Sequence, residues 1–152
     1  MDLDALETRE GAILLDQFTE DTALRLGAIL VQLAQALSAP LVIDIRSADR
    51  TFFHVALPGS TPLNAFWARR KSNTALLMQA SSFLIGQRNA ARGETLARHG
   101  LDPADYADHG GAVPIRVRGA GVVAVATVSG LPQAEDHALV LEALERLAGA
   151  AS

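Results

Sequence analysis

Two pairs of adjacent residues carry the clearest potential for chemistry in this sequence. The first pair, Arg70 and Lys71, lies within a predicted helix, and Arg69 falls on its opposite side. At 100° per residue, Arg70 shares one face with mostly apolar residues, and Lys71 lies at the edge of that face. This face comprises Leu63, Phe66, Trp67, Thr74, Leu77, Met78 and Ser81. Because burying a lone cation is costly, the two cations must reach solvent, pair with an acid or contact an anionic ligand.

The second pair, Asp136 and His137, lies in the first turn of a predicted C-terminal helix. His137 precedes Val140 and Leu141 by three and four residues, so it belongs to the inward side of that helix. An inward imidazole beside a carboxylate suits general acid–base chemistry. The same arrangement is also typical of a core histidine whose ring nitrogens bond to the backbone or to Asp. The residues leave both interpretations open.

Two glycine-containing segments add candidate backbone contacts. His109-Gly110-Gly111 precedes a predicted strand, where the glycines either let a ligand approach the backbone or form a turn. Ser129-Gly130 follows another strand just before the C-terminal helix, where backbone amides either hold an anion or cap the helix.

Other motifs point away from several classes of protein. Gly119 to Ala124 matches a dinucleotide-binding pattern, but it opens a strand rather than a helix, which favours a turn. The chain has no cysteine, and neither His54 nor His99 has helical metal-ligand spacing with another histidine, so we expect no metal site. A net charge of −4 argues against nucleic acid as the main partner.

Length and composition predict one globular domain over residues 1–152, with 49% hydrophobic and 20% charged residues. An acidic N-terminus without a signal-peptide pattern, and the lack of an apolar run of about 18 residues, predict a cytoplasmic protein without a membrane partner.

Periodicity and turn residues predict an α+β fold in the α/β class, with helices flanking a sheet. The expected helices are 19–37, with Thr19 as N-cap, 61–81, a short surface helix within 86–100, and one opened by Pro132. The expected strands form two hairpins, 41–46 with 51–57 and 113–117 with 122–128, and a fifth strand at 12–15. Five strands with few crossovers favour a mainly antiparallel sheet.

Four ordered motifs together resemble the haem-degrading-domain family, in a branch related to glycolate-operon and haem-binding members. They are Asn64-Ala65-Phe66-Trp67 with Arg69 to Thr74, then Ser81-Ser82, then His109-Gly110-Gly111 with Pro114-Ile115, and Val128 to Gln133 with Asp136-His137. The resemblance implies a five-stranded, profilin-like antiparallel sheet, a homo-oligomer and an association with haem. The residues that it carries over are Trp67, Arg70, Lys71, His109, Gly110, Gly111, Ser129, Asp136 and His137.

These observations support three hypotheses. In the first, a homo-oligomer binds a small carboxylate-bearing molecule through Arg70 or Lys71 and the backbone near Gly111, Ser129 and Gly130, with haem propionates as a special case. In the second, an enzyme uses His137 as general acid–base, Asp136 to orient it and Lys71 to stabilise negative charge. In the third, the chain is an assembly scaffold. We expect Arg70 and Lys71 to converge with Asp136 and His137, and haem to bind weakly without a defined axial ligand.

Overall fold

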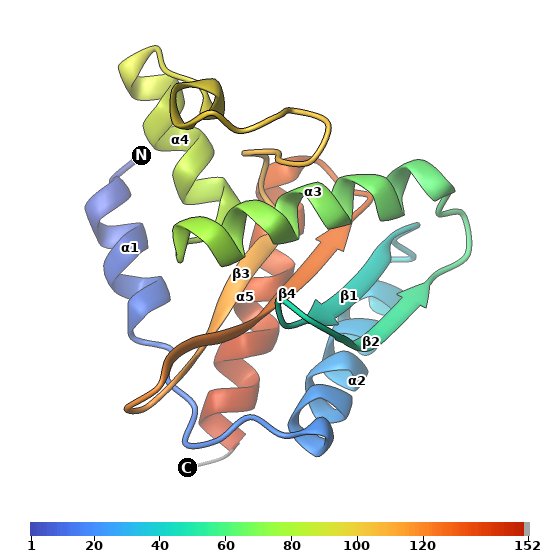
Figure 1. The fold of residues 1–152 in the computed structure, drawn as a ribbon. Helices are drawn as coiled ribbons and strands as arrows, with labels where there is room; N and C mark the ends of the chain where they lie inside the picture. The colour runs from blue at the N-terminus through green and yellow to red at the C-terminus, as the bar shows by residue number, and fades with distance from the viewer. Residues whose placement is uncertain (151–152) are drawn as a thin grey trace.

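A four-stranded antiparallel sheet forms the middle of the molecule, with strand order β2-β1-β4-β3 (Figure 1). The structure is a computed structural model that describes residues 1–150. Its elements are α1 (Leu3–Gly11), α2 (Glu20–Ala36), β1 (Val42–Arg46), β2 (Thr51–Ala56), α3 (Pro62–Met78), α4 (Ser82–Arg92), the 3-10 helix η1 (Leu96–His99), β3 (Ala112–Val117), β4 (Gly121–Ser129) and α5 (Gln133–Ala150).

Helices cover both faces of this sheet. α2 and α5 pack side by side on one face, and α3 crosses the other (Figure 1). The main apolar core lies on the α2 and α5 side, where Leu26, Leu30, Ile43, Ile45 and Leu144 are all buried. Burial of this many aliphatic side chains is the main source of stability for such a fold.

Both predicted hairpins are present, and the α+β class with an antiparallel sheet flanked by helices is confirmed. β3 and β4 are joined by a turn in which Gly119 and Gly121 have φ of +75° and +80°. Residues with a Cβ rarely adopt this conformation, so the glycines account for the tight connection. The predicted start of α2 is also correct, because the Thr19 side chain accepts a hydrogen bond from the Thr22 amide.

The prediction of five strands is wrong. Within residues 12–15, only Leu15 pairs with the sheet, through a single bridge to Val117. Ala12 is the C-cap of α1, a helix that the apolar pattern did not predict, and residues 13–14 are irregular. α1 begins with a capping interaction in which Asp2 accepts a hydrogen bond from the Ala5 amide.

Two helix boundaries also differ from the prediction. α3 ends at Met78 because Gln79 adopts the left-handed conformation, and Ser81 caps a new helix, α4, by accepting a hydrogen bond from the Leu84 amide. α4 begins before the predicted surface helix, with Phe83 and Leu84 buried against the rest of the chain, whereas residues 90–92 are exposed. Of the predicted 86–100 helix, the second part is the 3-10 turn η1.

α3 faces the sheet with small and polar residues rather than with its bulkiest apolar ones. Ala68, Ser72 and Ala75 are buried, whereas Leu63, Phe66 and Leu77 are exposed. Ser72 also shares a hydrogen bond of 2.8 Å with Thr127 of β4. The predicted inward face of this helix was therefore wrong, because small side chains let the helix approach the sheet closely and leave no room for large ones.

No helix within residues 1–150 combines the length and hydropathy that crossing a bilayer requires.

The exposed apolar residues lead us to predict a homo-oligomer. Leu24 on α2, Leu37 at its C-cap, and Leu63 and Phe66 on α3 each expose more than two fifths of their surface. Such side chains on two helices are typical of surfaces that another subunit covers. Light scattering at micromolar concentration should give a mass that is a multiple of 16.0 kDa. A mass near that of one chain, unchanged up to millimolar concentration, would contradict this prediction.

Candidate functional site

A pocket of about 250 Å³ lies where the first half of α3 meets the end of β4 and the start of α5. We call it the Lys71 pocket. Its lining residues come from three separate parts of the sequence, and most of them are polar. They are Asn64, Trp67, Lys71, His109, Ser129, Gly130, Leu131, Gln133 and Asp136.

Lys71 is the only lysine in the chain, and its side chain is only 4% exposed. Its ammonium group donates one hydrogen bond to the Val128 carbonyl and one to Asp136 Oδ2, both of 3.1 Å. An ammonium group has three N–H donors. The third donor has no acceptor among the described residues, and the side chain borders the pocket.

Asp136 is the counter-ion of Lys71, and backbone amides complete its surroundings. Its Oδ1 accepts a hydrogen bond of 3.0 Å from the Leu131 amide, and its Oδ2 accepts one of 3.3 Å from the Gly130 amide. Burial raises the pKa of Asp136 and lowers the pKa of Lys71, and the attraction between the two charges opposes both shifts. The attraction between the two charges thus offsets only part of the free energy that both groups lose when they are removed from water.

These hydrogen bonds change the expected role of the Ser129-Gly130 segment. The amides of Gly130 and Leu131 point to Asp136 and are not free for a ligand. The segment contributes the Ser129 side chain instead, which is buried at the pocket wall and has no hydrogen-bond partner among the described residues. The hydrogen-bond donors that line this pocket are therefore side chains rather than these backbone amides.

Two amide side chains supply further donors at the rim. The side-chain oxygen of Gln133 accepts a hydrogen bond from the backbone amide of Gly110. The side-chain oxygen of Asn64 accepts one from the backbone amide of Thr61. Because each oxygen already has a partner, each NH₂ group remains available for a ligand. Both residues lie within the motifs of the family resemblance. The sequence did not indicate a role for them in the site, because amide side chains also serve as ordinary capping residues.

Gly110 and Gly111 shape the pocket by leaving space. Gly111 has φ of +139°, and a Cβ there would collide with Lys71 Nζ and the Val128 carbonyl. A Cβ on Gly110 would collide with the backbone carbonyl of Gln133 and with the Phe83 ring. The glycines therefore let the 109–111 loop pass close to Lys71.

Arg70 lies next to the Lys71 pocket but not in it. Its guanidinium stacks on the Trp67 ring at 4.4 Å and donates a hydrogen bond of 2.7 Å to the Pro103 carbonyl. Trp67 in turn meets the His109 ring edge-on, with centroids 5.0 Å apart. Arg70 and His109 both line a neighbouring pocket of about 370 Å³ under the 95–108 loop.

His137 lies outside both of these pockets. Its ring stacks on Phe83 at 4.8 Å, and its Nε2 is 3.6 Å from Glu10 Oε1. Neither ring nitrogen has a hydrogen-bond partner among the described residues, and burial lowers the pKa of His137 to about 4. Only half of the predicted convergence therefore occurs, because Lys71 meets Asp136 while Arg70 and His137 point elsewhere.

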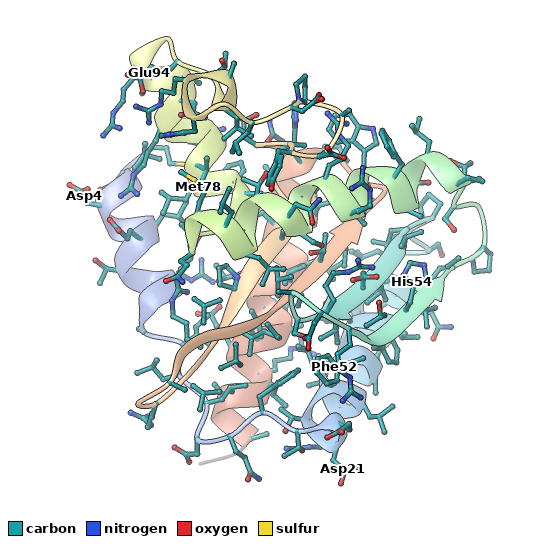
Figure 2. All side chains as sticks on the ribbon, viewed as in Figure 1. Asp4, Asp21, Phe52, His54, Met78 and Glu94 are labelled. Atoms are coloured by element: carbon teal, nitrogen blue, oxygen red, sulfur yellow. The ribbon has the colours of Figure 1, made fainter. Side chains whose placement is uncertain are left out.

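A second polar cluster lies on the same face of the sheet as α3. His54 projects from β2 (Figure 2), and its Nδ1 is 2.7 Å from Asp44 Oδ2. Arg46 also binds this buried carboxylate. Within the described part of the chain, no group of three or more His, Asp or Glu side chains has the arrangement that a metal ion needs.

Comparison with known proteins identifies the family. Residues 18–145 match the model of a family described as haem-degrading protein HbpS-like. The chain belongs to this family. It is 48% identical over 145 residues to the UPF0303 protein SCO2848 of Streptomyces coelicolor, covering 95% of this chain and 92% of that one. It is 46% identical over 144 residues to a UPF0303 protein of Paraburkholderia xenovorans, covering 94% and 87%.

Solved structures support the same fold. The Ybr137w protein superposes with a TM-score of 0.90 at 32% identity, covering 99% of this chain and 89% of that one. HbpS gives a TM-score of 0.69 at 19% identity, covering 90% and 94%. A structure described as a PduOC:heme complex gives 0.70 at 19% identity, covering 84% and 93%. The last two likenesses concern the fold alone.

The Lys71–Asp136 pair predicts a pH-dependent loss of stability in Lys71→Met. At pH 7 we expect this variant to lose about 3–5 kcal/mol, because it leaves a buried carboxylate unpaired. Without Lys71 the pKa of Asp136 rises further, so the folded state retains a proton that the unfolded state releases. Stability should therefore increase as the pH falls from 7 towards 5. Urea unfolding of Lys71→Met at pH 7 and at pH 5 tests this. The double variant Lys71→Met/Asp136→Asn should recover part of the lost stability. An equal loss at both pH values would contradict it.

His137 predicts a separate sensitivity to acid. Its pKa is about 4 in the folded chain against 6.5 ordinarily, so the unfolded state binds more protons between these values. The folded state should lose up to about 3 kcal/mol as the pH falls through this range. Burial raises the pKa of Glu10, which stabilises the folded state as the pH falls and so offsets part of this loss. His137→Phe, which keeps a ring against Phe83, should lose less stability on acidification, whereas the exposed-site control His99→Phe should behave as wild type. Identical pH profiles for all three proteins would refute the assignment.

Proposed function

We propose that the chain binds a small carboxylate-bearing molecule in the Lys71 pocket, as a subunit of a homo-oligomer. The observation that carries this proposal is the third N–H donor of Lys71, which borders the pocket without an acceptor among the described residues. Ser129, Gln133 and Asn64 surround it with further available donors. A carboxylate is the group that best satisfies several converging donors around one cation.

The charge of the site also favours an anion of low charge. Lys71 and Asp136 together carry no net charge, and among the described residues no second lysine and no arginine lines the pocket to balance a highly charged ligand. The ligand must therefore gain most of its binding energy from hydrogen bonds to the ammonium group and to neutral donors, which are worth more in a buried site than in water.

Haem is a poorer match for the Lys71 pocket than a small acid. The pocket volume of about 250 Å³ lies below the range of roughly 300–1,000 Å³ that is usual for drug-sized ligands, and haem is larger than most of these. Among the histidines, His109 borders the pocket, but His137 is buried elsewhere and His54 is bound to Asp44. The residues fit a propionate group better than an enclosed, axially ligated haem.

The enzyme hypothesis loses its proposed acid–base. His137 does not reach the Lys71 pocket, and its lowered pKa reflects burial beside Phe83 rather than activation by Asp136. The scaffold hypothesis is also weaker, because the carried-over residues Trp67, Lys71 and Ser129 line a shared pocket. Ligand binding is the function that the arrangement supports best.

Acetate binding to the full-length chain tests the proposal. In protein labelled with ¹⁵N-lysine, the single lysine gives a single ammonium signal, which we expect to shift saturably with acetate. Calorimetry or backbone amide shifts near Ser129 then give the dissociation constant. Ser129→Ala should raise this constant several-fold, because it removes one donor without disturbing the ion pair.

Variants that keep the fold make the result decisive. Lys71→Met/Asp136→Asn replaces the buried charges by neutral groups and should abolish acetate binding, while Arg98→Met, at an exposed cation, should leave it unchanged. Equal acetate affinity in wild type and the double variant would reject the Lys71 pocket as the binding site.

A further inference from the structure

The pocket under the 95–108 loop adjoins the Lys71 pocket and has a different chemical character. We call it the loop pocket. Its volume is about 370 Å³, and its apolar lining includes Leu96, Leu101, Pro103 and Tyr106. The His109 side chain belongs to the lining of both pockets, and Arg70 on one side stacks on Trp67 on the other. A donor-rich pocket and an apolar pocket thus share one wall.

The wall between the two pockets is formed by the His109 side chain. His109 is exposed, and its ring has no hydrogen bond to the rest of the described chain. Its contact with Trp67 is edge-on, which leaves the outer face of the imidazole free for a ligand that passes over it. A molecule anchored at Lys71 can therefore extend across His109 into the loop pocket.

The loop pocket is built rather than incidental. Three side chains of α3 hold the loop: Arg69 binds the Ala104 carbonyl and the Asp105 carboxylate, Asn73 binds the Asp105 carbonyl, and Thr74 accepts a hydrogen bond from the Ala107 amide. Ligand sites are usually preformed in this way, because a rigid wall loses little entropy when the ligand binds.

We propose that the natural ligand is an amphipathic carboxylic acid whose carboxylate binds at Lys71 and whose apolar body occupies the loop pocket. This inference rests on the proposed function and adds the class of ligand. The Lys71 pocket alone lies below the volume range that is usual for drug-sized ligands, but together with the loop pocket it falls well within that range. The apolar body supplies the binding energy that a single carboxylate in a pocket without net charge lacks.

A groove between α2 and α5 is the rival location for the apolar body. Leu131 borders both this groove and the Lys71 pocket, and Leu37 lines the groove. However, Glu135 and Glu142 line the groove without a cation, whereas in the loop pocket Arg70 balances the carboxylate of Asp108, so the groove is less favourable for an anionic ligand. The Leu131 backbone is also fixed by its bond to Asp136, so it separates the two spaces more firmly than His109 does.

A series of straight-chain acids tests the proposal in the full-length protein. Acetate, butyrate, hexanoate and octanoate serve as probes, and affinity should rise along the series by up to about fourfold per methylene group. Leu101→Ser, at a half-buried position in the loop pocket, should weaken octanoate at least tenfold and leave acetate unchanged. Leu37→Ser, the matched control in the rival groove, should affect neither probe.

The outcomes separate this inference from the proposed function. If acetate binds at Lys71 but octanoate binds no tighter, the amphipathic ligand is wrong and the carboxylate site stands. If octanoate binds tightly but only Leu37→Ser weakens it, the apolar body lies between α2 and α5 and the loop pocket is rejected. Failure of every acid to bind would overturn both proposals.

Discussion

The buried ion pair between Lys71 and Asp136 is the constraint on which the site depends. It joins the middle of α3 to the first turn of α5 across the end of β4, with a third contact to the Val128 carbonyl. A buried ion pair is a costly way to fill space, since apolar side chains of similar size often stabilise a fold as well or better. Its value here is orientation, because it fixes an ammonium group at the pocket wall with one donor left over.

The rest of the fold accommodates this pair. α3 lies close enough to the sheet for Lys71 to reach Val128 because its inward residues are alanine and serine rather than leucine. Gly111 keeps the neighbouring loop free of a Cβ that would displace the ammonium group. The polar contacts from the outer side of α3 then hold the 95–108 loop, so one helix positions both pockets.

The sequence predicted those elements whose local signals agree with their packing. The two hairpins have β-branched residues and glycine turns, and α2 has a capping threonine and an apolar stripe that packs on the sheet. The face of α3 was mispredicted because apolar periodicity does not detect a helix that packs through small residues. α1 was missed for a related reason, since it lacks a strong apolar stripe and is joined to α5 and α4 by the ion pairs of Arg9 with Glu145 and of Glu7 with Arg88.

The candidate site was predictable in its parts but not in its pairing. Lys71, Asp136, Trp67, His109 and Ser129 were all identified from the sequence, and all line the Lys71 pocket. Neighbouring residues in a helix point about 100° apart, however, so Asp136 and His137 face different surroundings despite their adjacency. Only tertiary structure determines that Asp136 meets Lys71 while His137 packs between Phe83 and Glu10.

The single, buried lysine gives this chain an unusual relation to amine-directed chemistry. All the other positively charged side chains are arginines or histidines, which acylating reagents do not modify in the way they modify a neutral amine. In the folded state such a reagent finds the terminal amine accessible and the ε-amine of Lys71 shielded within an ion pair. The rate at which Lys71 becomes acylated therefore reports how often its ion pair with Asp136 opens, and each modification event prevents that pair from forming again.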